Sequence, residues 1–267
     1  MNIFILITGN FMSNNNKEDI DRKDVKLAII LTLTFISLLF FNFLIISIIF
    51  SMADWLATLI FSVLFIVPAY FSNAGMVIVG GGKPLDKGKL WRDGRRILGD
   101  HKTVSGLVKG PLYIGIPLSS ALFLLFFILW PFIQQIPIEG QTLGVYKLYS
   151  ELFHYQHYFI GGSFPIGIVI ILLRIVFCSY GAAFGDLAGS FLKRRFNIKS
   201  GAPFWVVDQL DFAVGAIIFA LIPAIFFPGL YLIPDLNIII FLLILTPSVS
   251  LIANTIAYLI NLKDVPW

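Results

Sequence analysis

The chain has 267 residues, of which 58% are hydrophobic and only 13% are charged, and its mean hydropathy is +0.90. A soluble domain carries roughly 25% charged residues, so about half of the usual charged complement is missing. Such a chain has too little polar surface to cover a water-soluble particle, and we expect no nucleic-acid partner. The composition therefore predicts an integral membrane protein. Cys178, the single cysteine, lies in an apolar run and is expected to be a buried structural thiol.

The N-terminal segment carries no clear targeting signal. Met1–Thr8 is a short apolar run with no basic residue before it and no evident cleavage site after it. Met12, which precedes a polar stretch, would serve equally well as a first residue. We therefore assign no function to Met1–Phe11.

Six apolar stretches follow, and a membrane-spanning helix needs about 20 apolar residues. The stretches are Leu27–Met52, Trp55–Phe71, Pro111–Ile136, Phe159–Phe184, Phe212–Ile233 and Leu236–Ile260. Pro68 can end or kink the second stretch, and a re-entrant pair formed by the first two would reduce the count to five. The sequence thus predicts an all-α integral membrane protein with five to six transmembrane helices.

The Lys and Arg residues fall almost entirely on one side of the predicted spans. Apart from Lys147 and Arg174, the other 17 of the 19 lie in the N-terminal segment, the C-terminal tail and the connections after the second and fourth spans. Positively charged connections stay in the cytoplasm, so both termini and these two loops are predicted to be cytoplasmic. Arg174 lies within a span, where we expect it to pair inside the bundle or with backbone carbonyls.

The predicted outer connection around residues 143–159 is rich in aromatic side chains, which we interpret as an interfacial helix or belt. These residues are Tyr146, Tyr149, Phe153, Tyr155 and Tyr158. His154 and His157 are three residues apart, but two ligands do not complete a metal site, and none is predicted there.

The basic loop at Gly80–Gly110 interleaves glycines with charges of both signs. A cytoplasmic bias explains its lysines and arginines, but it does not explain Asp86, Asp93 and Asp100, or glycines that allow close backbone approach. We interpret the loop as one that wraps a polyphosphate, with Lys and Arg as counter-charges. Asp86 and Asp93 are expected to hold it together through arginine pairs. It is not a P-loop, because two residues separate the second glycine of that pattern from Lys102.

The second basic loop is bordered by two polar pieces, Gly185–Arg195 and Asp208-Gln209-Leu210-Asp211. If the first piece continues the preceding helix, Asp186, Ser190 and Lys193 fall on one helix face. If the second piece opens the next helix, its two aspartates also share a side. A face with carboxylate, hydroxyl and amine groups, opposed to a carboxylate pair, has the parts of a magnesium-nucleotide site.

Glycines recur every four residues on the helix that leads into this loop. They are Gly181, Gly185 and Gly189, with Gly215 on the following helix. This small-residue spacing lets helix backbones approach closely, which would bring Asp186 near Asp208 and Asp211. Three carboxylates at a membrane interface are costly unless a divalent cation neutralises them. Oxygen ligands completed by nucleotide phosphates favour Mg²⁺.

Taken together, these motifs resemble the membrane-integral CTP:lipid-phosphate cytidylyltransferases, the CDP-diglyceride synthase family. The resemblance is carried by an acidic residue, a serine, a Lys-Arg pair and a final Asp-x-x-Asp. In this chain these are Asp186, Ser190, Lys193-Arg194 and Asp208-Gln209-Leu210-Asp211. The bacterial members end in Pro-Gly-His-Gly-Gly before Asp-Arg-x-Asp, whereas this chain has Gly201-Ala202-Pro203-Phe204 and Gln209.

That departure, with Pro84-Leu85-Asp86, Trp91–Arg96 and Gly99–Gly106, looks like the archaeal, CDP-archaeol synthase branch. The resemblance covers roughly residues 68–260, so we expect an N-terminal tail and additional helix at residues 1–53 and a cytidylyltransferase domain at residues 54–267. It implies two substrates, CTP and a prenylated glycerol ether phosphate lipid, with transfer of CMP and release of pyrophosphate. The implied location is the cell membrane, with the active site facing the cytoplasm.

The resemblance also implies roles for individual residues. Asp186, Asp208 and Asp211 would be catalytic as Mg²⁺ ligands, and Ser190 would orient a phosphate or a metal-bound water. The nucleotide phosphates would be held by Lys102, Thr103, Lys193 and Arg194, while Arg95 and Arg96 would meet either CTP or the lipid head group.

Two alternative functions remain open from the sequence. One is a phosphatidate cytidylyltransferase that uses a diacyl lipid, because apolar helices do not disclose lipid tail chemistry. The other, from a different class, is a lipid transporter or scaffold without chemistry. We find no internal repeat, and the polar residues cluster on the predicted cytoplasmic side, so the enzyme is favoured.

Overall fold

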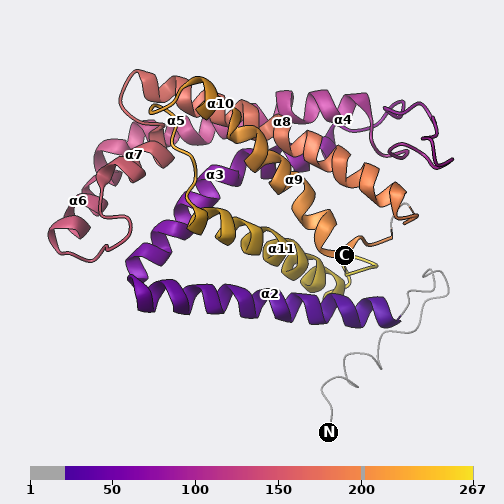
Figure 1. The fold of residues 1–267 in the computed structure, drawn as a ribbon, viewed down its shortest axis with the longest axis horizontal. Coiled ribbons are helices and arrows are strands. Elements are labelled where there is room, and N and C mark those ends of the chain that lie inside the picture. Colours follow the sequence, from indigo (N-terminus) through magenta and orange to yellow (C-terminus); the bar gives the residue numbers. More distant parts are fainter. Residues whose placement is uncertain (1–21, 200–201, 267) are drawn as a thin grey trace, which may run out of the picture.

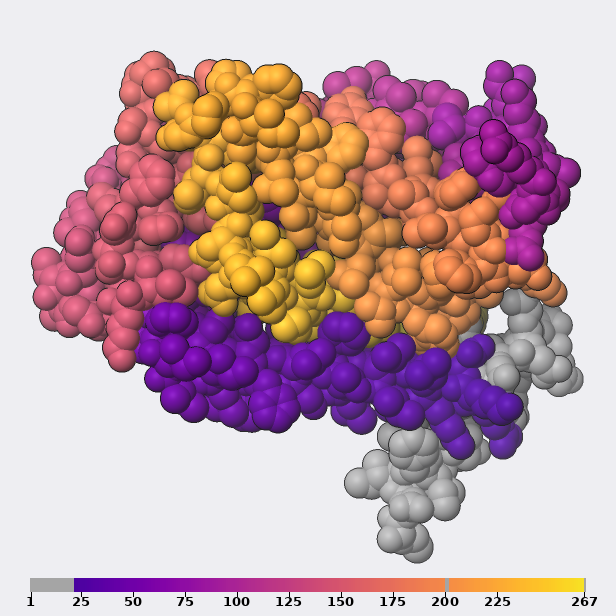
Figure 2. Space-filling model, in the orientation of Figure 1, coloured from indigo at the N-terminus to yellow at the C-terminus, as the bar shows by residue number. Residues whose placement is uncertain are grey.

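The computed structural model describes residues 22–199 and 202–266, which are helical apart from loops and two isolated β-bridges. The helices are α2 (Arg22–Ile49), α3 (Met52–Ile78), α4 (Val104–Lys109), the π-helix η1 (Gly110–Gly115), α5 (Ile116–Ile133), α6 (Gln135–Thr142), α7 (Leu152–Ile160), α8 (Ile166–Arg195), α9 (Trp205–Ala220), α10 (Ile222–Phe226) and α11 (Leu236–Leu259). Helix α2 lies along one edge of the bundle against α11, as the indigo band in Figure 2 shows (Figures 1 and 2). Met1–Phe11, to which the sequence analysis assigned no function, lies outside the described residues.

Six helical segments of the described chain are long and apolar enough to cross a membrane, which confirms the larger predicted count. They are Arg22–Ile49, Met52–Ile78, Val104–Thr142, Ile166–Arg195, Trp205–Phe226 and Leu236–Leu259. The first two are separate helices of 28 and 27 residues rather than a re-entrant pair. The prediction of an all-α membrane protein is therefore confirmed.

The second span does not end at Pro68, because α3 continues through this proline to Ile78. Two hydrogen bonds join this part of α3 to the neighbouring helix α8. The hydroxyl of Ser179 donates to the carbonyl of Pro68 at 3.4 Å, and the hydroxyl of Ser72 donates to the carbonyl of Ser179 at 2.8 Å. The continuation places Asn73 and Met76 beside the basic loop.

The fourth span is displaced toward the second basic loop relative to its predicted bounds. Phe159 belongs to α7, which ends at Gly161 in the left-handed conformation, so α8 begins only at Ile166. Helix α8 then continues to Arg195, and α9 begins at Trp205. Both conditional predictions are confirmed, because the two polar pieces lie on helices rather than in the loop between them.

Three of the five aromatic residues of the outer connection are buried in the bundle rather than exposed as a belt, although Leu152–Ile160 does form a helix, α7. Tyr149, Tyr155 and Tyr158 are buried and pack around Phe61 of α3, with ring centroids 4.6–5.2 Å from the Phe61 ring. A buried carboxylate explains why the connection folds inward. Asp54 at the start of α3 accepts hydrogen bonds of 2.9–3.0 Å from the backbone amides of residues 147–149.

Arg174 confirms the prediction that it pairs with backbone carbonyls. Its side chain is 1% exposed, and its guanidinium donates to the carbonyls of Tyr158 at 2.7 Å and His157 at 3.5 Å. These carbonyls lie at the C-terminal end of α7, where the helix dipole favours a cation. The guanidinium also lies 5.0 Å from the ring centroid of Phe123. Arg174 therefore joins α7 to α8.

Helices α8 and α9 form the most extensive helix pair in the described chain, and the predicted glycine spacing explains their contact. A Cβ atom added at Gly181 would lie 2.6 Å from the carbonyl oxygen of Gly215, and one at Gly185 would lie 2.2 Å from that of Asp211. Real Cβ atoms essentially never come so close to backbone atoms. The absence of side chains at these positions therefore sets the distance between the two helices.

A Gly185→Ala substitution tests this packing. We expect it to destabilise the protein by about 1–3 kcal/mol, because the new methyl group must push the α9 backbone away. Thermal unfolding of the purified protein in detergent measures the effect. Ala188→Val, which enlarges an exposed side chain on the same helix, is the control and should change the midpoint little. An unchanged midpoint for the Gly185 variant would contradict the packing argument.

Candidate active site

Asp86 organises the loop between α3 and α4. Its side chain is fully buried and binds the Arg96 guanidinium at 2.9 Å. It also accepts backbone hydrogen bonds from Gly88 at 3.0 Å and Leu98 at 3.1 Å. Arg96 forms a second ion pair with Asp100. These contacts confirm that Asp86 holds the loop through an arginine pair, and they fold the loop back on itself.

The same loop is attached to the C-terminal end of α8. Asp93 pairs with Arg195 at 2.7 Å, which confirms the predicted pairing of Asp93 with an arginine, although the arginine lies on the helix. The buried hydroxyl of Ser190 donates to the carbonyl of Leu98 at 3.3 Å. Figure 1 shows the loop beside the C-terminal end of α8, at the end of the bundle where α2 and α9 begin.

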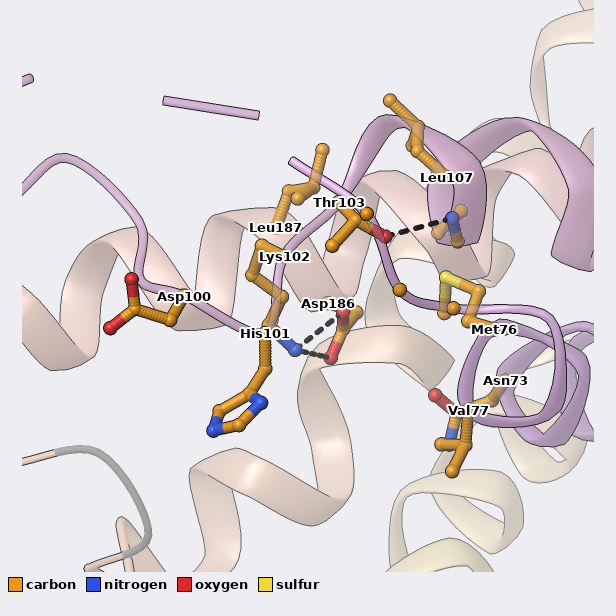
Figure 3. Close-up of a pocket in the computed structure, with 15 residues that line it drawn as sticks. Asn73, Met76, Val77, Asp100, His101, Lys102, Thr103, Leu107, Asp186 and Leu187 are labelled. Atoms are coloured by element: carbon orange, nitrogen blue, oxygen red, sulfur yellow. Dashed lines mark hydrogen bonds and ion pairs between the residues drawn. The ribbon is translucent and has the colours of Figure 1, made fainter. Parts of the chain in front are cut away.

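Lys102 and Asp186 join the two polar regions that the sequence singled out. The Lys102 ammonium group lies 2.7 Å from both carboxylate oxygens of Asp186, as the dashed lines in Figure 3 show. Thr103, the next residue, is buried and accepts a hydrogen bond of 3.1 Å from the Gly106 amide, so its hydroxyl caps α4. The capped start of α4 thus fixes the backbone position from which the Lys102 side chain extends.

The ion pair lies in a cavity of about 620 Å³. The polar part of its lining consists of the backbone of residues 80–82 and the side chains of Asp100, His101, Lys102 and Asp186. The apolar part consists of Met76, Val77, Leu107, Ala183 and Leu187. Asn73 of α3 also lines the cavity, near Val77 (Figure 3). The cavity therefore suits a ligand that has both a charged and an apolar part.

Asp208 and Asp211 lie on the first two turns of α9. Asp208 accepts a 2.7 Å ion-pair contact from Lys193 and a 2.8 Å hydrogen bond from the amide of Phe204. Asp211 packs against Gly189, where an added Cβ would lie 2.1 Å from its carboxylate oxygen. Asp211 also interacts electrostatically with Asp186, Asp208 and Lys102. The close α8–α9 contact therefore gathers these charged groups at one end of the bundle.

Among the described residues, no group of three or more acidic, His or Cys side chains is arranged to hold a metal ion. Asp186 and Asp208 each bind a lysine, whereas Asp211 forms no ion pair within the described ranges. The donors are all carboxylate oxygens, which suit Mg²⁺ chemically. For Asp186 or Asp208 to bind a metal ion, its ion pair with Lys102 or Lys193 would have to break or rearrange.

The remaining predicted nucleotide-binding residues contact other parts of the chain. Arg95 donates to the carbonyl of Arg195, and Arg194 donates to the carbonyl of Ile198 at 2.7 Å. Arg96 is held between Asp86 and Asp100. These three guanidinium groups hold the loop and the end of α8 in place, while Lys102 extends into the cavity (Figure 3).

Sequence reasoning missed Asn73 and His101 as cavity residues and Arg195 as a contact of the first loop. Asn73 was missed because the second span was expected to end at Phe71. A polar side chain one turn beyond Pro68 could have suggested a longer helix with a functional end. His101 lies between Gly99 and Lys102, and the sequence analysis assigned no role to it.

These features define a multi-pass membrane protein with a charged cavity that is formed by the first basic loop and by helices α3, α4 and α8. A sequence profile described as CarS-like CDP-archaeol synthase matches residues 52–126 and 140–267. The CDP-archaeol synthase of Thermococcus kodakarensis is 36% identical over 215 residues, which are 80% of this chain and 99% of that protein. The CDP-archaeol synthase of Methanospirillum hungatei is 33% identical over 203 residues, which are 75% of this chain and 99% of that protein.

One solved structure is also similar, described as "Structural insight into an intramembrane enzyme for archaeal membrane lipids biosynthesis". It is 25% identical, covers 75% of this chain and 92% of that chain, and has a TM-score of 0.44. On the evidence of the profile and the curated relatives, the chain belongs to the CarS-like CDP-archaeol synthase family. The family resemblance stated from the sequence motifs is confirmed.

The Asp86 pair makes the first loop sensitive to strong acid. Burial alone would raise the pKa of Asp86, but hydrogen bonds from Arg96 and two backbone amides, with the Arg96 charge, lower it from 3.8 to about 2. Because the folded pKa lies below the ordinary one, the stabilisation is complete above pH 3.8 and is lost as the pH falls through about 2.

We expect amide exchange in residues 87–98, corrected for its chemical pH dependence, to accelerate as the pH falls from about 4 to 2. Hydrogen–deuterium exchange with mass spectrometry measures this change. Asp86→Asn should exchange faster than the unaltered protein at neutral pH and lose the acid-dependent step. The same acid-dependent step in both proteins would show that another group is responsible.

Proposed function

We propose that the protein transfers CMP from CTP to an unsaturated archaeal ether-lipid phosphate, giving a CDP-archaeol precursor and pyrophosphate for membrane phospholipid synthesis. The observation that carries this proposal is the cavity in which Lys102 of the first loop meets Asp186 of α8. Membership in the CDP-archaeol synthase family supplies the reaction class. The mixture of charged and apolar residues in the cavity lining is consistent with a substrate that joins a phosphate to an apolar chain.

In this reaction the lipid phosphate attacks the α-phosphorus of CTP. The bond from that phosphorus to the bridging oxygen breaks, and pyrophosphate leaves. A phosphate monoester has a second pKa of about 6, so it is mostly ionised at neutral pH and needs no general base. The task of the protein is to align the two phosphates and to offset their negative charge, as in other phosphoryl transfers.

The lysines of the site are suited to that task. Lys102 in the first loop and Lys193 on α8 are each bound to one aspartate. We assign Lys102, Lys193 and Arg194 to the CTP phosphates, with Thr103 fixing the direction of Lys102. Ser190 binds the carbonyl of Leu98 and orients the loop beside the phosphates. Arg95 and Arg96 hold the same loop in place through their contacts with the carbonyl of Arg195 and with Asp86.

Asp186, Asp208 and Asp211 are the residues that would hold Mg²⁺, with nucleotide oxygens completing its shell. The ion would supply positive charge at the phosphates during transfer. Lys102 and Lys193 neutralise two of the three aspartates, and on nucleotide binding each would move from its carboxylate to a phosphate. This exchange would leave Asp186 and Asp208 each near a positive charge before and after nucleotide binding.

The site is assigned to the cytoplasmic side of the cell membrane, where CTP is present. The distribution of Lys and Arg supports this orientation, because the loop and the end of α8 that form the cavity are both basic. An amphiphilic lipid phosphate would approach from the bilayer with its phosphate at the same interface. The apolar wall formed by α3, α4 and α8 provides the corresponding surface.

A substrate comparison tests the proposed reaction. Purified protein is given CTP, Mg²⁺ and either the unsaturated ether-lipid phosphate or a diacyl phosphatidate, and CDP-lipid formation is measured. We expect the ether lipid to be preferred, and chelation of Mg²⁺ to abolish product formation. Preference for the diacyl lipid would indicate the alternative cytidylyltransferase, and absence of product from both lipids would favour a non-catalytic protein.

Substitution of the aspartates tests the assigned residues. Asp186→Asn and Asp208→Asn should each lower the rate of pyrophosphate release at least about 100-fold, because charge stabilisation at the phosphates is lost. The thermal midpoint should change little, since both side chains lie partly exposed at the end of the bundle. Asp264→Asn, the same change at an exposed acidic residue, is the matched control. Undiminished release in both variants would remove these residues from the site.

A further inference from the structure

Arg195 contacts the first loop at several points. Its guanidinium binds the carboxylate of Asp93 at 2.7 Å and donates to the carbonyl of Arg96, with a longer contact of 3.5 Å to the carbonyl of Arg95. It also lies 4.8 Å from the ring centroid of Phe191, one turn earlier on α8. A planar guanidinium suits several simultaneous contacts of this kind, which a lysine ammonium does not.

An aromatic contact strengthens the same attachment. The ring of Trp91 in the loop meets the ring of Phe191 edge to face, with centroids 5.4 Å apart. In return, the guanidinium of Arg95 donates to the carbonyl of Arg195 at the end of α8. The segment from Trp91 to Arg96 is therefore fixed on α8 by charge, hydrogen bonds and aromatic packing together.

From this attachment, a chain of direct contacts leads to Lys102. Arg195 binds the backbone of Arg96, whose own side chain binds Asp86 at 2.9 Å. Leu85, the neighbour of Asp86, donates its amide to the carbonyl of Lys102 at 2.7 Å. The position of the Lys102 backbone therefore depends on the attachment of the loop to α8.

We propose that Arg195 and Asp93 form a latch that holds the first loop on α8 and sets the position of Lys102 opposite Asp186. Arg195 is a positioning residue in this account, and its effect on catalysis rests on the proposed function. Its two terminal nitrogens bind the loop, and its Nε is buried without a hydrogen-bond partner among the described residues. The side chain is only 18% exposed. It is thus occupied by the loop rather than presented to a nucleotide.

The attachment itself is tested without any substrate. Hydrogen–deuterium exchange is measured on the full chain in detergent for the unaltered protein, Arg195→Gln and Asp93→Asn. We expect exchange in residues 89–102 to accelerate about tenfold in both variants, while exchange in α5 and α11 is unchanged. Arg92→Gln is the matched control, because Arg92 is exposed in the same loop and has no ion pair within the described ranges. Unchanged exchange in both variants would overturn the latch.

Action through Lys102 is tested with a double-mutant cycle on kcat/KM for CTP. Arg195→Gln and Lys102→Ala alone should each lower this value at least about tenfold. If Arg195 acts by positioning Lys102, the Arg195 change should have less than a twofold further effect in the Lys102→Ala background. Additive effects would show that Arg195 acts on the substrate directly, and would overturn its positioning role.

The Arg195→Lys variant and the exchange experiment distinguish a failure of the latch from a failure of the proposed function. Arg195→Lys keeps the charge but cannot bind Asp93 and the Arg96 carbonyl together, so it should restore only part of the loop protection. If Arg195→Gln fails to fold, Asp93→Asn tests the latch from its more exposed partner, whose side chain is 38% exposed. If the variants show faster loop exchange but the unaltered protein has no cytidylyltransferase activity, the latch is supported and the proposed function is rejected.

Discussion

The backbones of α8 and α9 can lie in contact only because Gly181, Gly185 and Gly215 have no side chains at the crossing. Within a bilayer, no hydrophobic driving force pushes two apolar helices together, so close van der Waals packing has to hold them. Here the same packing places Asp211 against α8, next to the turn that carries Asp186. One sequence feature, glycine at every fourth position, thus serves both the stability of the pair and the assembly of the charged site.

The charged groups at this end of the bundle compensate one another in the absence of ligand. Asp186 and Asp208 each have a lysine partner, and the arginines of the first loop bind carboxylates or carbonyl groups. A site for a highly charged nucleotide must be stable both empty and full. Lysine partners on Asp186 and Asp208 would meet this requirement, because a lysine side chain can change partner without a change in the helices. Arg96, which binds both Asp86 and Asp100, instead maintains the shape of the loop.

Much of the fold could be predicted from the sequence because membrane helices obey a simple constraint of length and apolarity. The number of spans, the glycine contact and the arginine pairs of Asp86 and Asp93 all followed from local patterns. The buried position of Tyr149 did not, because it depends on Asp54, which is distant in sequence and binds the amides beside that tyrosine. The family resemblance was correct because it joined motifs from both loops. The contact of Arg194 with the carbonyl of Ile198 could not be predicted, since a basic side chain near a nucleotide loop can bind either phosphate or protein.

The π-helix η1 gives the first loop a fixed rotational phase relative to the membrane span that follows it. A π-helical turn holds one more residue than an α-helical turn, and each residue of an α-helix turns the chain by about 100°. Loss of a single residue between Gly110 and Gly115 would convert the turn to α-helix and rotate α4 about its axis by roughly that angle. Lys102, which precedes the N-cap Thr103 of α4, would then no longer lie opposite Asp186. The orientation of the loop relative to α5 therefore depends on the exact number of residues between them. An insertion or deletion there would disrupt the site without altering any residue within it.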